Sequence, residues 1–262
     1  MSRSDERASK EMYEQRTAML PFPIRQELVG KRFVLITEEA TRRSAKNRSL
    51  ENYSWKQGYI RACSVKDLQD KELQVLVEFD GLTWEYRQWI KIYEQTKAFF
   101  VENTIIWAAR VFRSGNTHRN TALSWPALIF VPLVDYLGLD NDSKHPVEYF
   151  GDKHLAFLKD NEVTLYKESE ENLKQVYCLN ALVQEDLMGW KRLQKTQACL
   201  MNGAETLTGA RVTVYRLELR QWYTGCITSH NLTTRELHVM DDNVLQTHSV
   251  HPALVQINLM AN

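Results

Sequence analysis

Apolar positions in this chain come in short runs separated by turn residues, and most runs are rich in β-branched and aromatic side chains. In the first third of the chain these runs occupy residues 33–36, 55–60, 73–79 and 86–90. The third run partly alternates apolar and polar residues, and Asp80-Gly81 directly after it predicts a tight turn between two strands. Four or five short strands within about 70 residues predict a small bent barrel rather than an open sheet.

A weak repeat of this pattern occurs near the C-terminus. The shared skeleton is G-x-R-[FV], then W-x-x-G-x-I, then a β-rich run that ends in Asp, and it begins at Gly30 and again at Gly209. The loop between the first two strands is longer in the first copy. Both copies resemble Tudor-type barrels, in which a W-Y-x-G-x-I strand is typical. The second copy matches more closely, because Lys56 stands in the first copy where Tyr223 supplies a ring in the second.

The middle of the chain holds an apolar run at residues 122–130 that predicts a buried strand. Pro126 lacks the N–H that a strand ladder uses, so we expect it at the start of the strand or at a bulge. Residues 147–151 predict another strand, closed by a glycine after two aromatic residues. The Ser-Trp-Pro-Ala sequence in the first stretch and the Tyr-Phe-Gly turn in the second resemble a PWWP domain, which covers roughly 100–205.

Apolar residues at helical spacing follow over about 168–202, and Asn202-Gly203 predicts the stop. The ordinary interpretation is a helix packed on its barrel. The fold is therefore predicted to be mainly β with a helical segment, as three small bent β-barrels that are Tudor-like, PWWP-like and Tudor-like. The predicted parts are an N-terminal tail at 1–26, a Tudor-like barrel at 27–98, a PWWP-like barrel with a helical tail at 99–205 and a second Tudor-like barrel at 206–262.

Charge and cysteine usage limit the classes of function. The 33 basic and 33 acidic residues give no net charge, so any attraction to nucleic acid has to be local. Four cysteines lie far apart without a C-x-x-C pair, which is typical of reduced thiols in a cytosolic or nuclear protein. The charged N-terminal residues contain no signal-peptide core, and the longest apolar run, 127–134, is too short to cross a bilayer.

Signatures of catalysis and of metal binding are missing from the sequence. None of the seven histidines is followed at the second position by Asp or Glu, which removes the signature of a two-histidine, one-carboxylate iron site. There is no G-x-S-x-G, no phosphate-binding glycine loop, and no cysteine pair to join His248 and His251. We therefore expect no catalytic residue, no metal and no cofactor in this chain.

Aromatic residues supply the strongest candidate for a binding site, because Tudor-like barrels hold methylated lysine or arginine between roughly two to four ring faces. The predicted cage residues are Trp55, Phe79, Asp80, Trp84 and Tyr86 in the first barrel, Tyr215 and Tyr223 in the last, and Phe150 in the central one. Asp80 would supply a carboxylate to a lower-methylated ammonium, whereas Trp55 and Phe79 are alternatively core residues. The last cage lacks a ring near 240–242. In the central barrel Ala122 stands where a ring is usual, and Trp125 is interpreted as core.

A basic loop is the second candidate for a binding site. The residues predicted to contact DNA are Lys31, Arg32, Arg42, Arg43, Lys46 and Arg48, with Lys153 as a separate point near the central barrel. Each such cation can displace a counterion from a phosphate backbone, which suits the loop to non-specific DNA contact. Alternatively the loop is merely solvated, or it is phosphorylated at Thr41 or Ser44.

Taken together, the order of the three barrels and several longer stretches resemble the N-terminal region of the lysine-specific demethylase 3 family, jumonji-type enzymes that act on lysine nine of histone H3. The stretches that carry the resemblance are 27–33, 77–84, 87–93, 124–128, 221–225 and 250–256. The resemblance implies a nuclear, chromatin-associated protein. Its implied partners are a histone tail or nucleosome, the DNA backbone and transcription regulators, with no membrane. In that family the jumonji catalytic domain and its zinc finger lie far downstream, so demethylation is not expected of these residues.

Two classes of function therefore stay open. One is a chromatin-binding module that docks on histone tails, DNA or a partner protein. The other is a structural or interaction scaffold whose cages have lost ligand binding. A further alternative is that the chain is part of a full-length demethylase that depends on iron and 2-oxoglutarate.

Overall fold

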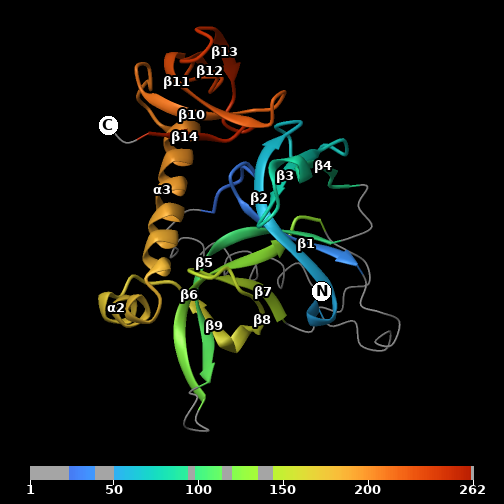
Figure 1. Ribbon diagram of the computed structural model, residues 1–262, viewed down its shortest axis with the longest axis vertical. Helices are drawn as coiled ribbons and strands as arrows, with labels where there is room; N and C mark the ends of the chain where they lie inside the picture. Colours follow the sequence, from blue (N-terminus) through green and yellow to red (C-terminus); the bar gives the residue numbers. More distant parts are fainter. Residues whose placement is uncertain (1–23, 39–49, 94–97, 114–119, 135–143, 261–262) are drawn as a thin grey trace, which may run out of the picture. The chain divides into compact units, whose positions relative to one another are not determined.

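The structure is a computed structural model that describes residues 24–38, 50–93, 98–113, 120–134 and 144–260. Strands dominate the described residues, and two helices accompany them (Figure 1). This confirms the predicted class, mainly β with a helical segment, although the strands form open sheets that do not close into barrels. The chain divides into two compact units. One holds the described parts of 1–26, 103–131 and 141–187, and the other holds those of 27–102, 132–140 and 188–262.

The strands β1 to β9 form one nine-stranded sheet in two parts. The first part, called the first sheet, consists of β1 (Arg32–Glu38), β2 (Ser54–Cys63), β3 (Gln74–Phe79), β4 (Gln88–Lys91) and the start of β5 (Phe99–Arg113). Its strand order is β4-β3-β2-β1-β5, and all neighbours are antiparallel. Phe33 of β1 lies opposite Gly58 of β2 and Val101 of β5. The Phe33 ring stacks on Phe99 with the ring centroids 5.1 Å apart, and it meets Phe79 edge-on at 5.6 Å. Burial of these rings forms the core of the first sheet.

The last sheet consists of β10 (Arg211–Arg216), β11 (Gln221–His230), β12 (Leu237–Asp241), β13 (Thr247–Val250) and β14 (Ile257–Leu259). Its strand order is β13-β12-β11-β10-β14. Val212 of β10 lies opposite Gly225 of β11 and Leu259 of β14, which is the pairing that Phe33 makes in the first sheet. The two sheets share strand order and register, and this confirms the repeat predicted from the sequence.

The W-x-x-G-x-I pattern requires its glycine for the same steric reason in both sheets. A Cβ atom at Gly58 would lie 2.0 Å from the carbonyl oxygen of Glu78, and one at Gly225 would lie 2.4 Å from that of Met240. A side chain does not fit where the backbone of a neighbouring strand approaches so closely. The repeated glycine is therefore a requirement of the fold.

A second repeated feature is an arginine–aspartate pair that joins the first strand of each sheet to the end of the third. Nη1 of Arg32 donates to Oδ1 of Asp80 at 2.8 Å, and Nη1 of Arg211 donates to Oδ1 of Asp242 at 2.7 Å. In each pair the second guanidinium nitrogen bonds the other carboxylate oxygen, so both pairs are bidentate. These pairs hold the strand ends together in both sheets.

The first and last sheets belong to the same compact unit and share a hydrophobic core. Ala62 and Leu76 of the first sheet lie in one buried cluster with Tyr223 and Val255 of the last part of the chain. Ala62 and Val255 also form an antiparallel bridge, and Leu200 from the end of α3 joins the same cluster. The two repeats are therefore packed against each other, although residues 92–210 lie between them in sequence.

The central sheet consists of the remainder of β5 with β6 (Asn120–Pro132), β7 (Lys144–Tyr149), β8 (Leu155–Lys159) and β9 (Val163–Leu165). β6 pairs with β7, β7 with β8 and β9 with β5, all antiparallel. Pro126 lies inside β6 and not at its start, which differs from the expectation. The ladder with β7 begins one residue later, at Ala127, so the missing N–H of Pro126 costs no bond to β7.

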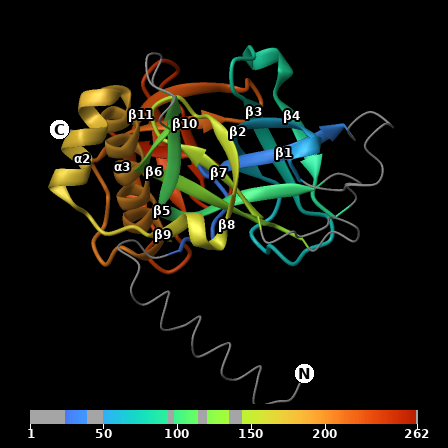
Figure 2. The same ribbon diagram turned by 90° about the horizontal axis from the view of Figure 1, so that it is seen from below.

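The predicted helical segment consists of two helices, α2 (Glu170–Leu179) and α3 (Leu182–Asn202), joined by a short turn (Figure 2). The Ser169 hydroxyl accepts a hydrogen bond from the N–H of Asn172, which caps the start of α2. Asn180 interrupts the helical run, and its side-chain oxygen accepts the N–H of Leu182 at 3.0 Å. α3 ends where the Asn-Gly sequence predicts its stop. Asp186 of α3 accepts the N–H of Gly151 at 3.0 Å, so the helix packs on its own sheet as predicted.

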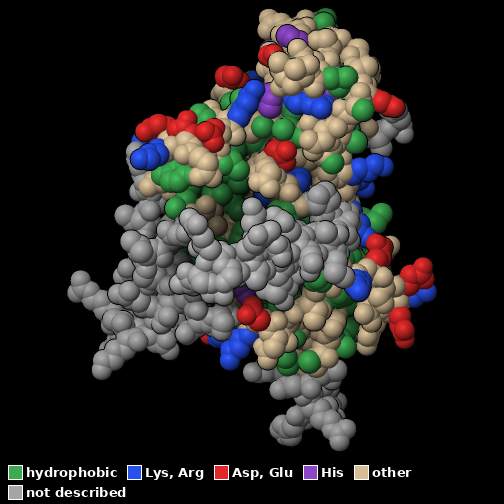
Figure 3. All heavy atoms as spheres, turned by 180° about the vertical axis from the view of Figure 1, so that it is seen from behind, with side chains coloured by type: hydrophobic (Ala, Val, Ile, Leu, Met, Phe, Trp, Pro, Cys, Tyr) green, Lys and Arg blue, Asp and Glu red, His purple; other side chains and the backbone are tan. Residues whose placement is uncertain are grey.

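Charged side chains of both signs are interspersed over the described surface on the face that Figure 3 presents. This agrees with the equal numbers of basic and acidic residues in the sequence. A binding surface on this chain has therefore to be found in particular side chains rather than in an overall electrostatic field.

Candidate functional site

Three aromatic rings of the central sheet surround one arginine side chain. The guanidinium carbon of Arg110 lies 4.7 Å from the ring centroid of Trp125, 4.8 Å from that of Tyr149 and 5.3 Å from that of Phe112. Arg110 and Phe112 are two residues apart on β5, so their side chains share one face, while β6 and β7 supply the other two rings. We call these three rings the central cage. A cation close to several ring faces is stabilised by the electrostatic quadrupole of each ring.

Hydrogen bonds to the backbone fix two walls of the central cage. The indole N–H of Trp125 donates to the carbonyl oxygen of Phe150 at 2.9 Å. The hydroxyl of Tyr149 donates to the carbonyl oxygen of Ala109 at 2.6 Å. Burial raises the pKa of Tyr149 to about 12, so the hydroxyl keeps its proton at neutral pH and continues to donate. Both rings are themselves buried, and their positions do not depend on a bond to Arg110.

One aspartate at the rim holds Arg110 in the central cage. Asp152 follows the Tyr-Phe-Gly turn, and its two carboxylate oxygens accept hydrogen bonds from the two terminal nitrogens of the guanidinium. The Asp152 side chain is 42% exposed, while that of Arg110 is 17% exposed. Partial burial raises the pKa of Asp152, but hydrogen bonds from Arg110 and from the N–H of His154 outweigh burial and leave this pKa below its ordinary value.

The central cage differs from the one predicted from the sequence. Phe150, the predicted wall, is buried, and it contributes its backbone carbonyl to the anchor of Trp125. Trp125, interpreted as core, is both core and cage wall. Tyr149 and Phe112 were missed, although an aromatic residue two positions after an arginine in a strand is a readable signal of rings and charge on one face. The cage role of Phe150 stays a prediction.

In the last sheet, Tyr223 also has an arginine over its ring. The guanidinium carbon of Arg216 lies 4.6 Å from the Tyr223 ring centroid. Arg216 pairs with Asp241 at 2.5 Å and donates to Nε2 of His248 at 2.7 Å. The Asp241 side chain is only 2% exposed, so this ion pair is anchored inside the sheet. Burial raises the pKa of Tyr223 to about 12, which keeps its hydroxyl neutral.

Tyr215 and Tyr223, the two residues predicted to form the last cage, line one pocket of about 430 Å³. Trp89 and Cys63 of the first sheet also line this pocket. Arg87 of the first sheet lies over the Tyr215 ring, with its guanidinium carbon 5.4 Å from the ring centroid. Burial raises the pKa of the Cys63 thiol to about 12, so this cysteine is not a nucleophile at neutral pH.

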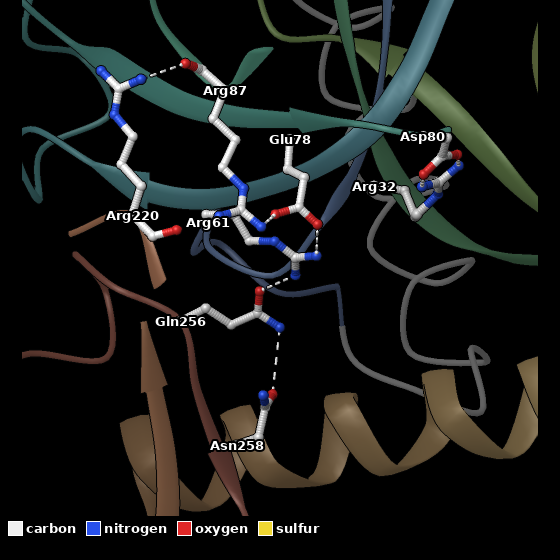
Figure 4. A network of polar contacts seen from close by, with 8 residues as sticks. All are labelled: Arg32, Arg61, Glu78, Asp80, Arg87, Arg220, Gln256 and Asn258. Carbon is white, nitrogen blue, oxygen red and sulfur yellow. Dashed lines mark hydrogen bonds and ion pairs between the residues drawn. The ribbon is translucent and has the colours of Figure 1, made fainter. Parts of the chain in front are cut away.

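A polar network ties the first sheet to the last one beside this pocket (Figure 4). Glu78 accepts from Arg61 at 2.6 Å and also pairs with Arg87. Arg61 donates in addition to the side-chain oxygen of Gln256 at 2.6 Å, and Arg220 donates to the backbone oxygen of Arg87 at 3.0 Å. Burial raises the pKa of Glu78, but the two arginines outweigh it, and the pKa lies below its ordinary value. This network serves the packing of the two sheets.

In the first sheet the predicted cage residues have different surroundings. Phe79 is buried, with Lys56 Nζ 5.2 Å from its ring centroid, and Asp80 is engaged by Arg32. Trp55 donates its indole N–H to a backbone carbonyl at 2.9 Å and packs edge-on against a phenylalanine of β5. Trp84 and Tyr86, by contrast, lie on the short 3-10 helix Trp84–Tyr86 and are 48% and 61% exposed. Whether these residues act as a cage stays a prediction.

The residues predicted to contact DNA differ in their exposure to solvent. Lys31 and Arg32 are 5% and 2% exposed, so neither side chain faces the solvent where a phosphate would have to lie, which differs from the expectation. Lys153 is partly exposed and sits in the turn after Asp152 with a positive φ of 54°. Arg42, Arg43, Lys46 and Arg48 lie outside the described residues.

Two classes of site receive no support from the described part of the chain. Its histidine, cysteine, aspartate and glutamate side chains include no group of three or more arranged to hold a metal ion. Its helices, likewise, include none with the length and apolar content that a membrane span requires. The geometry of the described residues is that of ring clusters and ion pairs.

Comparison with protein families matches three models to this chain. Residues 99–197 match the PWWP domain of lysine-specific demethylase 3B, and residues 199–262 match the tudor domain of the same protein. Residues 27–89 match a domain of unknown function. The PWWP match covers the central sheet with its helices, and the tudor match covers the last sheet.

Curated relatives align with nearly the whole chain. It is 39% identical to the probable JmjC domain-containing histone demethylation protein 2C of Homo sapiens over 240 residues, 90% of this chain. It is 29% identical to lysine-specific demethylase 3A of Gallus gallus and of Mus musculus, over 89% of this chain in both cases. The chain spans only 9% of the human protein's length, and 17% and 18% of the other two.

Proposed function

Since this chain belongs to the lysine-specific demethylase 3 family through its PWWP and tudor domains, we propose that it is a chromatin-docking module that binds the basic tail of a histone. The observation that supports this most is a pair of open aromatic rings, Trp84 and Tyr86, at the turn between β3 and β4. The proposal assigns binding to these residues and no catalytic step, and it places the protein in the nucleus.

Other large apolar side chains close to these two rings in sequence are also exposed. Leu82 is 41% exposed beside them, and Trp89 and Tyr93 are 38% and 36% exposed further along the same stretch. Five large apolar side chains exposed within a dozen residues are more than the scattered single residues of an ordinary surface. Such a surface suits a partner that covers it.

Charge favours a basic partner. Glu85 lies between the two rings in sequence and is exposed, and its carboxylate accepts from the Thr83 hydroxyl at 2.7 Å. A lysine or arginine side chain can lie on a ring face while its charge stays near this carboxylate. Histone tails are rich in both residues, and methylation of the lysine ammonium retains its charge.

The proposal is tested with the full 262-residue chain and histone H3 tail peptides, unmodified and lysine-methylated, in a titration followed by fluorescence anisotropy. Trp84→Ala and Tyr86→Ala are each expected to weaken binding about tenfold, because each removes one open ring face. Leu245→Ala is the matched control, since Leu245 is an apolar side chain that is 75% exposed between β12 and β13. Peptide binding that survives both ring substitutions would contradict the proposal.

A second function, an interaction scaffold without ligand cages, is favoured by one observation. Lys56 lies over Phe79 and Arg216 over Tyr223, so the chain's own cations already face two rings that were predicted to bind a ligand. If the folded chain binds no histone peptide and no nucleosome but still captures a protein partner, this second function replaces the first.

A further inference from the structure

We propose that the free edge of β13 takes an extended segment of a partner protein as an added strand, and that the adjacent pocket receives one large apolar side chain of that segment. The inference goes beyond the proposed function, because it concerns the last sheet and its pocket and not the open rings of Trp84 and Tyr86. It rests on three features of one compact unit: an uncovered strand edge, the lining of the pocket beside it, and an exposed carboxylate at that pocket.

The first feature is the outer edge of β13. β13 is the last strand of its sheet, and its far edge pairs with no other strand of the described chain. Asp241 donates its backbone N–H to the carbonyl oxygen of Gln246, where the hairpin begins. Bonded and non-bonded pairs alternate along an antiparallel ladder, so the backbone groups of His248 point to β12 and those of Thr247 and Ser249 point to the free edge.

This edge is open to a partner strand. Thr247 and Ser249 are exposed, and their backbone groups make no hydrogen bond to another described residue on the outer side. Folded proteins commonly protect such an edge with lysine, proline or a β-bulge. The β13 sequence contains neither lysine nor proline, and its pairing with β12 is regular. An unprotected edge of this kind is what an extended peptide uses when it binds by strand addition.

The second feature is the pocket of about 430 Å³ beside this edge. Ser249 and Val250 of β13 line it, Trp89 lines it from β4, and Leu217 and Leu254 add aliphatic walls. Ligand pockets have volumes of about 300–1,000 Å³, so this one is large enough for a side chain such as phenylalanine or leucine. Side chains of an added strand alternate between its two faces, so every second one would lie on the face of the pocket.

The third feature is the charge at the pocket. The charge of Arg216 is compensated by the buried Asp241. Glu218 also lines the pocket, is exposed, and forms no ion pair with another described residue. A lysine or arginine two positions from the apolar anchor lies on the same face of the added strand, where it is attracted by this carboxylate. The partner segment is therefore unmodified, with a large apolar residue and a basic residue two positions apart.

The first experiment identifies the segment. The full 262-residue chain is used to select peptides from a phage-displayed library of random heptapeptides. Selected peptides are expected to share a Phe, Trp, Leu or Ile with a Lys or Arg two positions away. The tightest of them becomes the probe for titrations followed by fluorescence anisotropy. Selection that yields no such pattern would overturn the proposal.

Backbone N-methylation of the probe tests strand addition on the unchanged chain. Each N-methyl group removes one N–H donor, and only alternate residues of an added strand direct their N–H groups to β13. N-methylation at those alternate positions is expected to weaken binding at least about tenfold, and at the positions between them less than about twofold. Losses that do not alternate along the probe would exclude strand addition.

Ser249→Pro is the corresponding change in the chain, because it removes an N–H that faces the free edge and costs no bond to β12. Ser249→Ala keeps this N–H and is the matched control, since both variants lose the hydroxyl that donates to Glu236. Ser249→Pro is expected to weaken probe binding at least about tenfold, and Ser249→Ala less than about twofold. Equal affinities in the two folded variants would contradict the proposal. If Ser249→Pro does not fold, the N-methylation series decides alone.

Two further substitutions test the pocket. Trp89→Ala removes an aromatic wall and is expected to weaken probe binding about tenfold. Glu218→Gln removes the exposed carboxylate and is expected to weaken it about threefold. A probe that binds Trp89→Ala as tightly as the parent chain lies outside the pocket, which would overturn the inference. Trp84→Ala and Tyr86→Ala are expected to leave probe binding unchanged, so failure of this inference and failure of the proposed histone contact are distinguishable.

A second copy of the chain is the competing occupant of the β13 edge. Sedimentation equilibrium of the parent chain and of Ser249→Pro distinguishes the two occupants. The expected result is a monomeric parent chain. A dimeric parent chain that becomes monomeric with Ser249→Pro would show that β13 pairs between copies, and the proposal of a partner segment would then fail.

Discussion

Arg110 and Arg216 both lie on aromatic rings and are each held by one aspartate, but these two aspartates differ in burial. The anchor of Arg110 is Asp152, whose side chain is 42% exposed, whereas the anchor of Arg216 is Asp241, whose side chain is 2% exposed. Each carboxylate also accepts the backbone N–H two residues further on, so the local geometry of the two anchors is alike. We therefore expect burial of the aspartate, rather than the cation–ring contact, to decide how firmly each of the two arginines is held.

The physical reason lies in what each pair leaves behind when it breaks. A carboxylate buried beside its arginine has no water to replace that partner, and the unpaired charge is costly. A carboxylate at the surface is solvated at once, so its pair contributes little. Arg216 also donates to His248, which adds a second fixed contact. We therefore expect Arg110 to leave its rings more readily than Arg216 leaves the ring of Tyr223.

The largest expected effect comes from removing the buried anchor. Asp241→Asn keeps an acceptor for the backbone N–H but removes the charge, and it is expected to lower the free energy of unfolding by about 3 kcal/mol. Asp152→Asn is the matched control, with an expected loss of less than about 1 kcal/mol. Urea denaturation of the three chains at neutral pH measures both. Equal losses in the two variants would show that anchor burial does not separate the two arginines.

Glu78 is intermediate in burial between Asp241 and Asp152, because its side chain is 21% exposed. It pairs with both Arg61 and Arg87. Glu78→Gln is expected to lower the free energy of unfolding by about 2 kcal/mol, since two charge-assisted contacts between the sheets weaken. Glu185→Gln on the exposed side of α3 is the control and should change stability by less than about 0.5 kcal/mol. A Glu78→Gln chain that melts at the same temperature as the control would mean that the network adds nothing to the packing of the two sheets.

The smallest expected effect is the pH dependence of the exposed anchor. The pKa of Asp152 lies below its ordinary value of 3.8 in the folded chain, so its stabilisation is fully present above pH 3.8. It is lost as the pH falls through the lower folded pKa, where the carboxylate takes up a proton. The difference in unfolding free energy between the parent chain and Asp152→Asn should therefore be constant from pH 7 to about 4 and shrink below that. A difference that grows on acidification would have the wrong sign.

The repeat shows which features of the fold can be predicted from short local sequence patterns. The G-x-R-[FV] and W-x-x-G-x-I patterns predict both Tudor-like sheets, because Gly58 and Gly225 are required by the close approach of a neighbouring strand. The arginine–aspartate pairs were not predicted, because Arg32 was interpreted as a DNA contact and Asp80 as a cage carboxylate, but both members of each pair lie within the repeated patterns. These features are local or lie between adjacent strands, and local spacing carries them.

The walls of the aromatic cages could not be predicted from the spacing of residues along the chain alone. Successive residues of a strand face opposite sides, so spacing alone does not decide which of Tyr149 and Phe150 lies beside Arg110. Trp89 reaches the pocket of Tyr215 and Tyr223 from a sheet more than a hundred residues earlier in the chain. Nor does a pattern of aromatic residues say that an arginine of the same chain already lies on the rings, since that depends on tertiary contacts.

One measurement tests the central claim, that the buried Asp241 holds Arg216 more firmly than the exposed Asp152 holds Arg110. Exchange of the guanidinium N–H protons with solvent can be followed for Arg110 and Arg216 in the same sample by NMR. The account predicts that Arg216 exchanges at least about tenfold more slowly than Arg110, because its anchor is buried. Equal rates, or slower exchange at Arg110, would contradict it.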